Sequence, residues 1–325
     1  MENFKKIGLL KRKKMAIEEL VKYYSELRKY ECNQGKELNG INLRKKIHFL
    51  VSIILEIDQL LSKEEIIILN DSHNNESDKS KIYACTRIGG NDIQRTFQVI
   101  KQPAYLMLGD PGILYKKIIY QGLKMNGVIP LETTDREDRK IAYNRSIELL
   151  KKGGNLLIYP EGAWNVSPNL VVMKIFNGTV RMAKETGAEI IPIAVEQYDK
   201  KFYFNIGESY TIPKTTPKSE KELTADLRDK LVTLKWDIME SQSILKRNEI
   251  KENYLEEFQN EIVGRCNYGY GFSLEDALNE SFHDKNVVTA DEVFSFLETL
   301  EIDKNNAFLA KDKTNYVLKK KNKRG

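Results

Sequence analysis

The sequence predicts an α/β fold in which a sheet is flanked by helices, with a helical hairpin before it and a helical extension after it. From about residue 66, short apolar runs alternate with helical stretches and glycine turns. Runs such as Leu156-Leu157-Ile158-Tyr159 lack polar alternation, which is typical of strands covered on both faces. The expected domains are residues 1–65 (hairpin), 66–215 (α/β domain) and 216–325 (helical extension with a basic tail).

Two amphipathic stripes predict the hairpin. Apolar side chains repeat at helical spacing over residues 17–27 and again over 43–61, and Gly35, Asn39 and Gly40 separate the two repeats. Residues 14–62 therefore form either a hairpin packed on the main domain or a segment that lies in the membrane interface. No run reaches the roughly 18 apolar residues of a spanning helix, and the apolar patch at residues 7–10 is too short for a secretory signal.

The middle of the chain supplies strands and helices in alternation. We expect strands at 66–69, 82–85, 105–108, 127–131, 156–159, 190–195 and 202–206, and helices at 113–125, 138–151 and 172–185. Ser219 followed by Glu222 is a capping box that begins a helix running to about residue 244. Residues 250–312 look helical and carry no readable chemistry.

Composition excludes several classes of protein. The 325 residues carry a net charge of +5, too little over this length to demand a nucleic-acid partner, so we expect none. Cys32, Cys85 and Cys266 include no CxxC pair, which argues against a disulfide framework and a zinc knuckle. Six basic residues lie in the first fourteen positions and five in the last seven. These ends are either solvated tails or segments attracted to anionic lipid headgroups.

One turn carries the chemistry. The strand at 156–159 runs directly into Pro160-Glu161-Gly162, so Glu161 stands at a carboxyl strand end, where such sheets bind ligands. A Pro-Glu-Gly turn by itself is typical of a surface turn with a solvated carboxylate. Its neighbours change the interpretation, because the strand at 82–85 runs into Arg87-Ile88-Gly89-Gly90-Asn91-Asp92.

This ordered set resembles the glycerolipid acyltransferase family, typified by 1-acyl-glycerol-3-phosphate acyltransferases, over about residues 66–212. The family's blocks are His-x4-Asp, a Gly-x-Ile strand, Phe-Pro-Glu-Gly and Ile-Pro; Tyr159-Pro160-Glu161-Gly162 and Ile191-Pro192 match the last two. The residues after the turn are similar to a bacterial subgroup. The resemblance implies a mixed sheet, and transfer of a fatty acyl group from acyl-CoA or acyl-carrier protein to a lysophospholipid-type hydroxyl in phospholipid synthesis. It implies no bound cofactor and no metal.

The first block departs at its general base. In the family a His accepts the proton of the acceptor hydroxyl and an Asp holds the imidazole; here Asp92 is present and Arg87 takes the His position. A guanidinium stays protonated, so Arg87 cannot be that base and is expected to pair with Asp92. The catalytic candidates are Asp92 and Arg87, and the alternative is an inactive member that binds lipid or acyl donor. His73 and Asp78 share the spacing but lie in a polar loop, and His48 and His283 are expected to be structural.

The substrate-binding candidates come from the matched blocks and the next helix. They are Gly127, Pro160, Glu161, Gly162, Trp164, Arg136 and Arg139. Thr133 and Trp164 stand where the family has phosphate-binding arginines, so either Arg136, Arg139 and Lys140 supply that charge or they form a solvated helix start. Trp164 is either an apolar wall for an acyl chain or an ordinary packed aromatic. The expected partners are an acyl donor, a lysophospholipid acceptor and an anionic membrane surface, with the protein peripheral at the cytoplasmic face.

Overall fold

The computed structural model describes residues 4, 6–73, 77–167, 170–243, 247–265, 273–279 and 295–322. His283 and Cys266 lie outside the described residues. The chain forms two units, residues 1–283 and 284–325. The division at residues 65 and 215 expected from the sequence stays a prediction.

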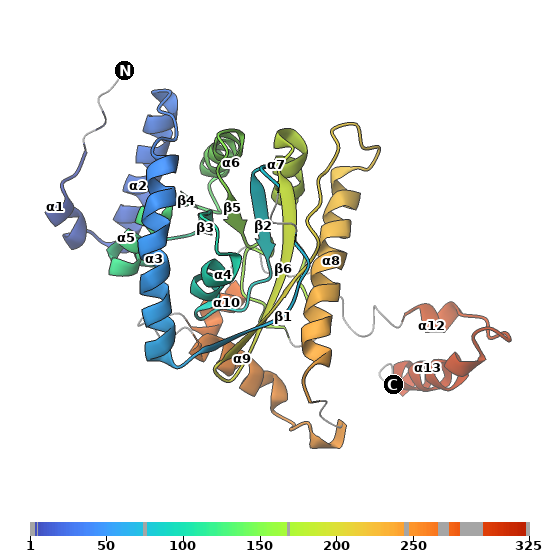
Figure 1. Cartoon of the computed structure of the whole chain (residues 1–325). Helices are drawn as coiled ribbons and strands as arrows, with labels where there is room; N and C mark the ends of the chain where they lie inside the picture. Colours follow the sequence, from blue (N-terminus) through green and yellow to red (C-terminus); the bar gives the residue numbers. More distant parts are fainter. Residues whose placement is uncertain are drawn as a thin grey trace. The chain divides into compact units, whose positions relative to one another are not determined.

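A seven-stranded mixed sheet forms the centre of the first unit (Figure 1). Its strands lie in the order β1-β7-β6-β2-β5-β3-β4, and every neighbouring pair is parallel except β6 with β7. The strands are β1 (Glu65–Asp71), β2 (Lys81–Cys85), β3 (Tyr105–Gly109), β4 (Val128–Leu131), β5 (Leu156–Ile158), β6 (Glu189–Tyr198) and β7 (Lys201–Ile206). All seven predicted strands are confirmed, and each is a short apolar run bounded by turn signals.

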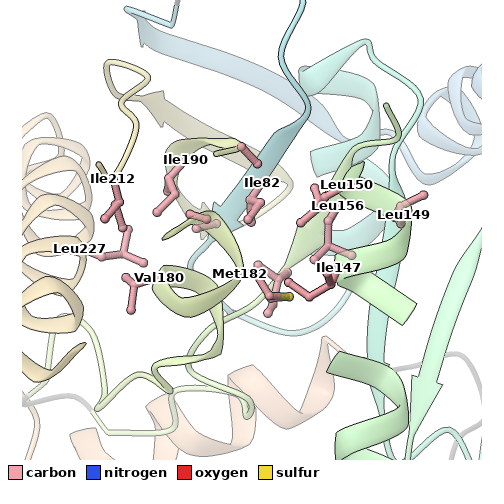
Figure 2. Packing of buried hydrophobic residues seen from close by; sticks show 14 of the residues in the cluster. Ile82, Ile147, Leu149, Leu150, Leu156, Val180, Met182, Ile190, Ile212 and Leu227 are labelled. Carbon is pink, nitrogen blue, oxygen red and sulfur yellow. The ribbon is translucent and has the colours of Figure 1, made fainter. Parts of the chain in front are cut away.

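One face of the sheet packs on α6 (Arg136–Lys151), α7 (Gly178–Thr186) and α8 (Glu220–Glu240). Figure 2 shows Ile82 and Ile190 of the sheet among side chains from these helices. The predicted capping box begins α8: the Ser219 amide donates to Glu222 Oε2 at 2.8 Å and the Glu222 amide donates to Ser219 Oγ at 3.3 Å. The apolar sides of α6, α7 and α8 therefore cover this face of the sheet.

The other face packs on α2 (Ile17–Asn33), α3 (Ile41–Ser62), α4 (Asp92–Ile100) and α5 (Ile118–Asn126). A short helix, α1 (Leu9–Lys14), precedes the hairpin. Arg28 of α2 holds the hairpin against the domain: Nε donates to Asp138 Oδ1 at 2.7 Å and Nη1 to the Tyr115 hydroxyl at 2.9 Å. The hairpin is therefore packed on the domain, as the first interpretation of its sequence expected.

Two helix predictions need correction, and one helix was not predicted. The helix expected at 172–185 begins only at Gly178, because the preceding residues donate amides to the Pro-Glu-Gly turn, Met173 to Glu161 and Phe176 to Pro160. The helix expected at 113–125 is a 3-10 turn, η1 (Ile113–Lys116), followed by α5. The sequence reading missed α4, whose first residue is Asp92.

Apolar side chains cover the outer surface of α3. The most exposed are Leu60 and Leu61, at 77% and 80%, and the same surface carries Leu43, Phe49, Leu50, Ile53 and Ile57, each at least 41% exposed. Among the described helices, none is both long and apolar enough to span a membrane. The helix thus packs through one side and leaves a continuous apolar side uncovered.

The parts of the extension after α8 that the structure describes contain several short helices, as expected. In the first unit it forms η2 (Arg247–Glu249), α9 (Tyr254–Gly264) and α10 (Leu274–Asn279). The second unit contains α12 (Phe296–Thr299), η3 (Ala307–Leu309) and α13 (Ala310–Asn322), and Lys313 of α13 donates to the Leu300 carbonyl.

Candidate functional site

A cavity of about 2100 Å³ opens at the carboxyl ends of the parallel strands β2, β3, β4 and β5. Ligands of α/β sheets bind at this edge. The cavity exceeds the 300–1,000 Å³ of ordinary small-molecule sites, which leaves room for long alkyl chains. Its apolar wall comes from α3, α4, η1, α5 and β3, with Val51, Ile54, Leu55, Ile93, Phe97, Leu106, Leu108, Leu114 and Leu123.

The loop after β2 brings Arg87 and Asp92 together. Arg87 Nη1 donates to Asp92 Oδ1 at 2.5 Å, while the amides of Ile88 and Gly89 donate to Oδ2 at 3.0 and 2.9 Å. Asp92 is fully buried, and the Arg87 side chain, 17% exposed, lines the cavity. The predicted ion pair is thus present at the wall of the cavity.

The guanidinium of Arg87 lies over a second cavity residue. Its Cζ atom is 4.7 Å from the centre of the Tyr159 ring, and the Tyr159 hydroxyl donates to Thr96 Oγ1 at 3.2 Å. Cation–π stacking favours the charged guanidinium at this position. Burial raises the pKa of the Asp92 carboxyl, while Arg87 and the two amides lower it. The site therefore presents a fixed cation at the wall of the cavity.

Glu161 braces the two loops of the site. It is 1% exposed, and its oxygens accept from the backbone amides of Arg87 and Met173, both at 2.9 Å. Burial raises the pKa of this carboxyl, and Lys235 lowers it. The side chain is not among the residues that line the cavity, so the solvated-turn interpretation is wrong and direct substrate contact by Glu161 stays a prediction.

The other residues of the turn do reach the cavity. Pro160, Gly162, Ala163 and Trp164 line it, and the Trp164 ring lies against Gly89, 3.3 Å from where a Cβ would stand. Trp164 thus fits both sequence interpretations, as a cavity wall and as a packed aromatic.

Gly127 is placed differently from the other candidates. Gly127 has a φ of +117°, and a Cβ at this position would lie 2.8 Å from the Tyr105 ring. Both facts favour glycine here. The residue is not among those lining the cavity, so the structure gives Gly127 a packing role; its neighbour Asn126 lines the cavity instead.

The rim on the α6–α7 side is cationic. Arg136, Arg139 and Lys140 of α6 line the cavity, as does Arg181 of α7, which the sequence reading missed. Arg181 stacks on Tyr143 at 5.1 Å and pairs with Glu220 at 3.4 Å. Within the part of the chain that the structure describes, three carboxylates line the same cavity, Asp58 of α3, Asp110 and Glu137, and the four cations of α6 and α7 outnumber them.

The histidines lie elsewhere. His48 is buried and its Nδ1 lies 2.8 Å from Asn126 Oδ1; His73 pairs with Asp71 rather than with Asp78. Among the described residues, no histidine lines the cavity and no group of three or more His, Cys, Asp or Glu could hold a metal ion.

Two contributions to the site carry weak sequence signals. The α3 wall could have been found from Val51 and Leu55, which share the inner side of the predicted stripe. Arg181 lies three residues after Gly178, the first residue of α7. Because the predicted helix began at residue 172 instead, the sequence did not indicate that Arg181 approaches α6.

Residues 93–196 match the family model described as Acyltransferase, beginning one residue after Asp92. A chloroplastic 1-acyl-sn-glycerol-3-phosphate acyltransferase of Arabidopsis thaliana is 26% identical over 152 residues, 47% of this chain and 42% of the plant protein. A chloroplastic 1-acyl-sn-glycerol-3-phosphate acyltransferase of Brassica napus is 29% identical over 92 residues, 28% of this chain and 26% of that protein. The matches thus span less than half the length of these curated relatives.

The crystal structure of the 1-acyl-sn-glycerophosphate acyltransferase from Thermotoga maritima is similar over 69% of this chain and 91% of that chain, with a TM-score of 0.49 and 16% identity. The family-model match covers the segment that holds Glu161 and Pro192, which lie in the last two blocks of the resemblance. Over residues 93–196 the chain is thus similar to the Acyltransferase family model, and over 152 residues to the plant 1-acyl-sn-glycerol-3-phosphate acyltransferase.

Proposed function

We propose that the chain binds a fatty acyl donor, acyl-CoA or acyl-carrier protein, together with a lysophospholipid-type acceptor, and that the Arg87–Asp92 ion pair makes acyl transfer between them slow. The reaction is the one named for its relatives, in a bacterial phospholipid-synthesis setting. No bound cofactor or metal enters it.

The Arg87–Asp92 pair at the wall of the cavity carries this proposal. Both oxygens of Asp92 are occupied, one by Arg87 and the other by two loop amides, so neither is available to take a proton from an acceptor hydroxyl. General-base catalysis contributes about 10²–10⁴-fold to such reactions, and that factor is what the chain lacks.

The cationic rim supports a phosphate-bearing ligand. Arginine favours phosphate through paired N–H donors, and Arg136 and Arg139 lie on the first turns of α6 beside the cavity. The apolar wall on the other side of the sheet takes the acyl chain, so one lipid spans both sides of the carboxyl edge.

The exposed apolar side of α3 supports a membrane-surface location. Val51, Ile54 and Leu55 line the cavity, whereas Phe49 and Ile53 are 69% and 41% exposed. An interfacial helix of this kind would place the cavity wall at the lipid surface from which the acceptor comes. We propose peripheral attachment at the cytoplasmic face through α3 and the basic termini.

Binding assays test the ligand part of the proposal. Lysophosphatidate should bind saturably in calorimetry, and Arg136→Ala with Arg139→Ala should weaken it by about tenfold or more, as the loss of charged hydrogen bonds does. Lys151→Ala, at the far end of α6, is the matched control. Binding equal in the double variant and the control would remove the cationic rim from the proposal.

Liposome sedimentation tests the membrane part. Phe49→Asp and Ile53→Asp should abolish the binding to phosphatidylglycerol liposomes that persists in high salt, since this fraction depends on apolar insertion. Met239→Asp, at a 37% exposed position of α8, should retain it. Retention by the α3 variants would exclude α3 as the membrane contact.

A further inference from the structure

The two glycines of the loop between Arg87 and Asp92 are each covered by a different element. The Trp164 ring lies against Gly89, and Arg265, at the end of α9, lies against Gly90: a Cβ on Gly90 would be 3.1 Å from the Arg265 Cβ and 3.3 Å from its carbonyl oxygen. Both glycines have positive φ, +82° and +61°. The loop is therefore held between the Pro-Glu-Gly segment and α9.

The segment after the turn is also packed on α9. Ile262, 3% exposed, and Phe258 form an apolar cluster with Trp164 and Val166. Gln259 donates to the Val166 carbonyl at 3.4 Å. The same helix thus contacts both loops that line the cavity next to Arg87.

The end of α9 is anchored to the sheet. Arg265 Nη2 donates to the Gln197 carbonyl at 2.9 Å, and Nη1 lies 3.7 Å from Glu196 Oε1. Glu196 also pairs with Lys235 of α8, whose Nζ lies 3.2 Å from Glu196 Oε2. The Lys235 side chain is only 5% exposed. The anchor is therefore a partly buried charge network, which fixes the end of α9 in place.

We propose that α9 is a clamp that sets the position of the Trp164 wall and of the Arg87–Asp92 loop, with Ile262 and Arg265 as its positioning residues. The clamp lies outside residues 93–196, so the site depends on the extension as well as on the acyltransferase domain. The expected effect of the clamp on lipid binding rests on the proposed function. The expected effect on the position of Trp164 does not.

The chain has two tryptophans, so the fluorescence of Trp164 can be measured alone once the other is replaced. In a Trp236→Phe background, where Trp236 is a 48% exposed residue of α8, Trp164 is the sole source of indole fluorescence. Without ligand, Ile262→Ala and Arg265→Ala should increase acrylamide quenching of Trp164. Ile262→Val should restore the quenching of the parent, and Leu255→Ala, at a 50% exposed position of the same helix, should not change it.

Ligand binding provides the second readout. Both Ala variants should weaken lysophosphatidate binding by about tenfold, because a displaced Trp164 ring no longer packs against the acyl chain of the ligand. Quenching and affinity equal to those of Leu255→Ala would overturn the clamp. If Ile262→Ala does not fold, Arg265→Ala decides alone. If no variant or parent binds lipid but quenching still rises, the clamp stands and the proposed function fails.

Discussion

Replacing Glu161 tests how the two loops of the site are held. In Glu161→Ala, the amides of Arg87 and Met173 lose a buried charged acceptor. A hydrogen bond to a charged group contributes about 1.5–3 kcal/mol, so two of them give about 3–6 kcal/mol. The raised pKa of Glu161 means that burial of the carboxylate opposes part of this gain, and we expect a net loss of about 2–4 kcal/mol.

Urea unfolding followed by circular dichroism measures that loss. Glu161→Gln retains one acceptor oxygen, and its loss should lie between those of the parent and Glu161→Ala. Glu240→Ala, at the exposed end of α8, is the control and should stay within about 0.5 kcal/mol of the parent. If Glu161→Ala unfolds with the same free energy as this control, the carboxylate is not a brace and the reasoning is refuted.

Three further perturbations follow. Arg87→Ala removes the cation that lowers the pKa of Asp92, so the pKa of Asp92 in the folded state rises further above its unfolded value. The loss of stability in this variant should be smallest in acid, where Asp92 is protonated, and should grow as the pH rises through the folded-state pKa. A difference in melting temperature that stays equal from pH 4 to 8 would contradict this. Arg28→Ala leaves Asp138 buried without its partner and should lower the free energy of unfolding by about 3–5 kcal/mol in urea, whereas an effect below about 1 kcal/mol would show that the pair does not hold the hairpin. Deleting residues 1–14 or 319–325 should weaken sedimentation with phosphatidylglycerol liposomes at low salt but not at about 0.5 M, where screening is strong; unchanged low-salt binding would make both ends solvated tails.

Much of the sheet could be predicted from sequence because its strands are short apolar runs with clear turn signals. The ion pair was predictable as well, since the Arg87 and Asp92 positions follow a strand that ends at the site. The position of Trp164 at the cavity followed from its place after the Pro-Glu-Gly turn.

Other features depend on tertiary contacts that leave little local signal. Glu161 accepts hydrogen bonds from amides 74 and 12 residues away, and no local sequence pattern encodes these contacts. The start of α7 moved because Met173 donates to the same carboxylate instead of continuing a helix. The contact of Arg265 with Gly90 joins segments separated by much of the chain, so the extension offered no readable chemistry in sequence.

Acyl transfer by Arg87→His tests the central claim most directly. An imidazole in place of the guanidinium can donate one N–H to Asp92 Oδ1, the oxygen that Arg87 now occupies, and keep its other nitrogen free to accept a proton. The assay uses radiolabelled acyl-CoA and acyl-carrier protein with a panel of lysophospholipids, and Arg87→His with Asp92→Asn is the control. We predict slow or undetectable transfer by the parent, an increase of about 10²-fold or more in Arg87→His, and loss of that increase in the double variant. Robust transfer by the parent that persists in Arg87→Ala would contradict the account.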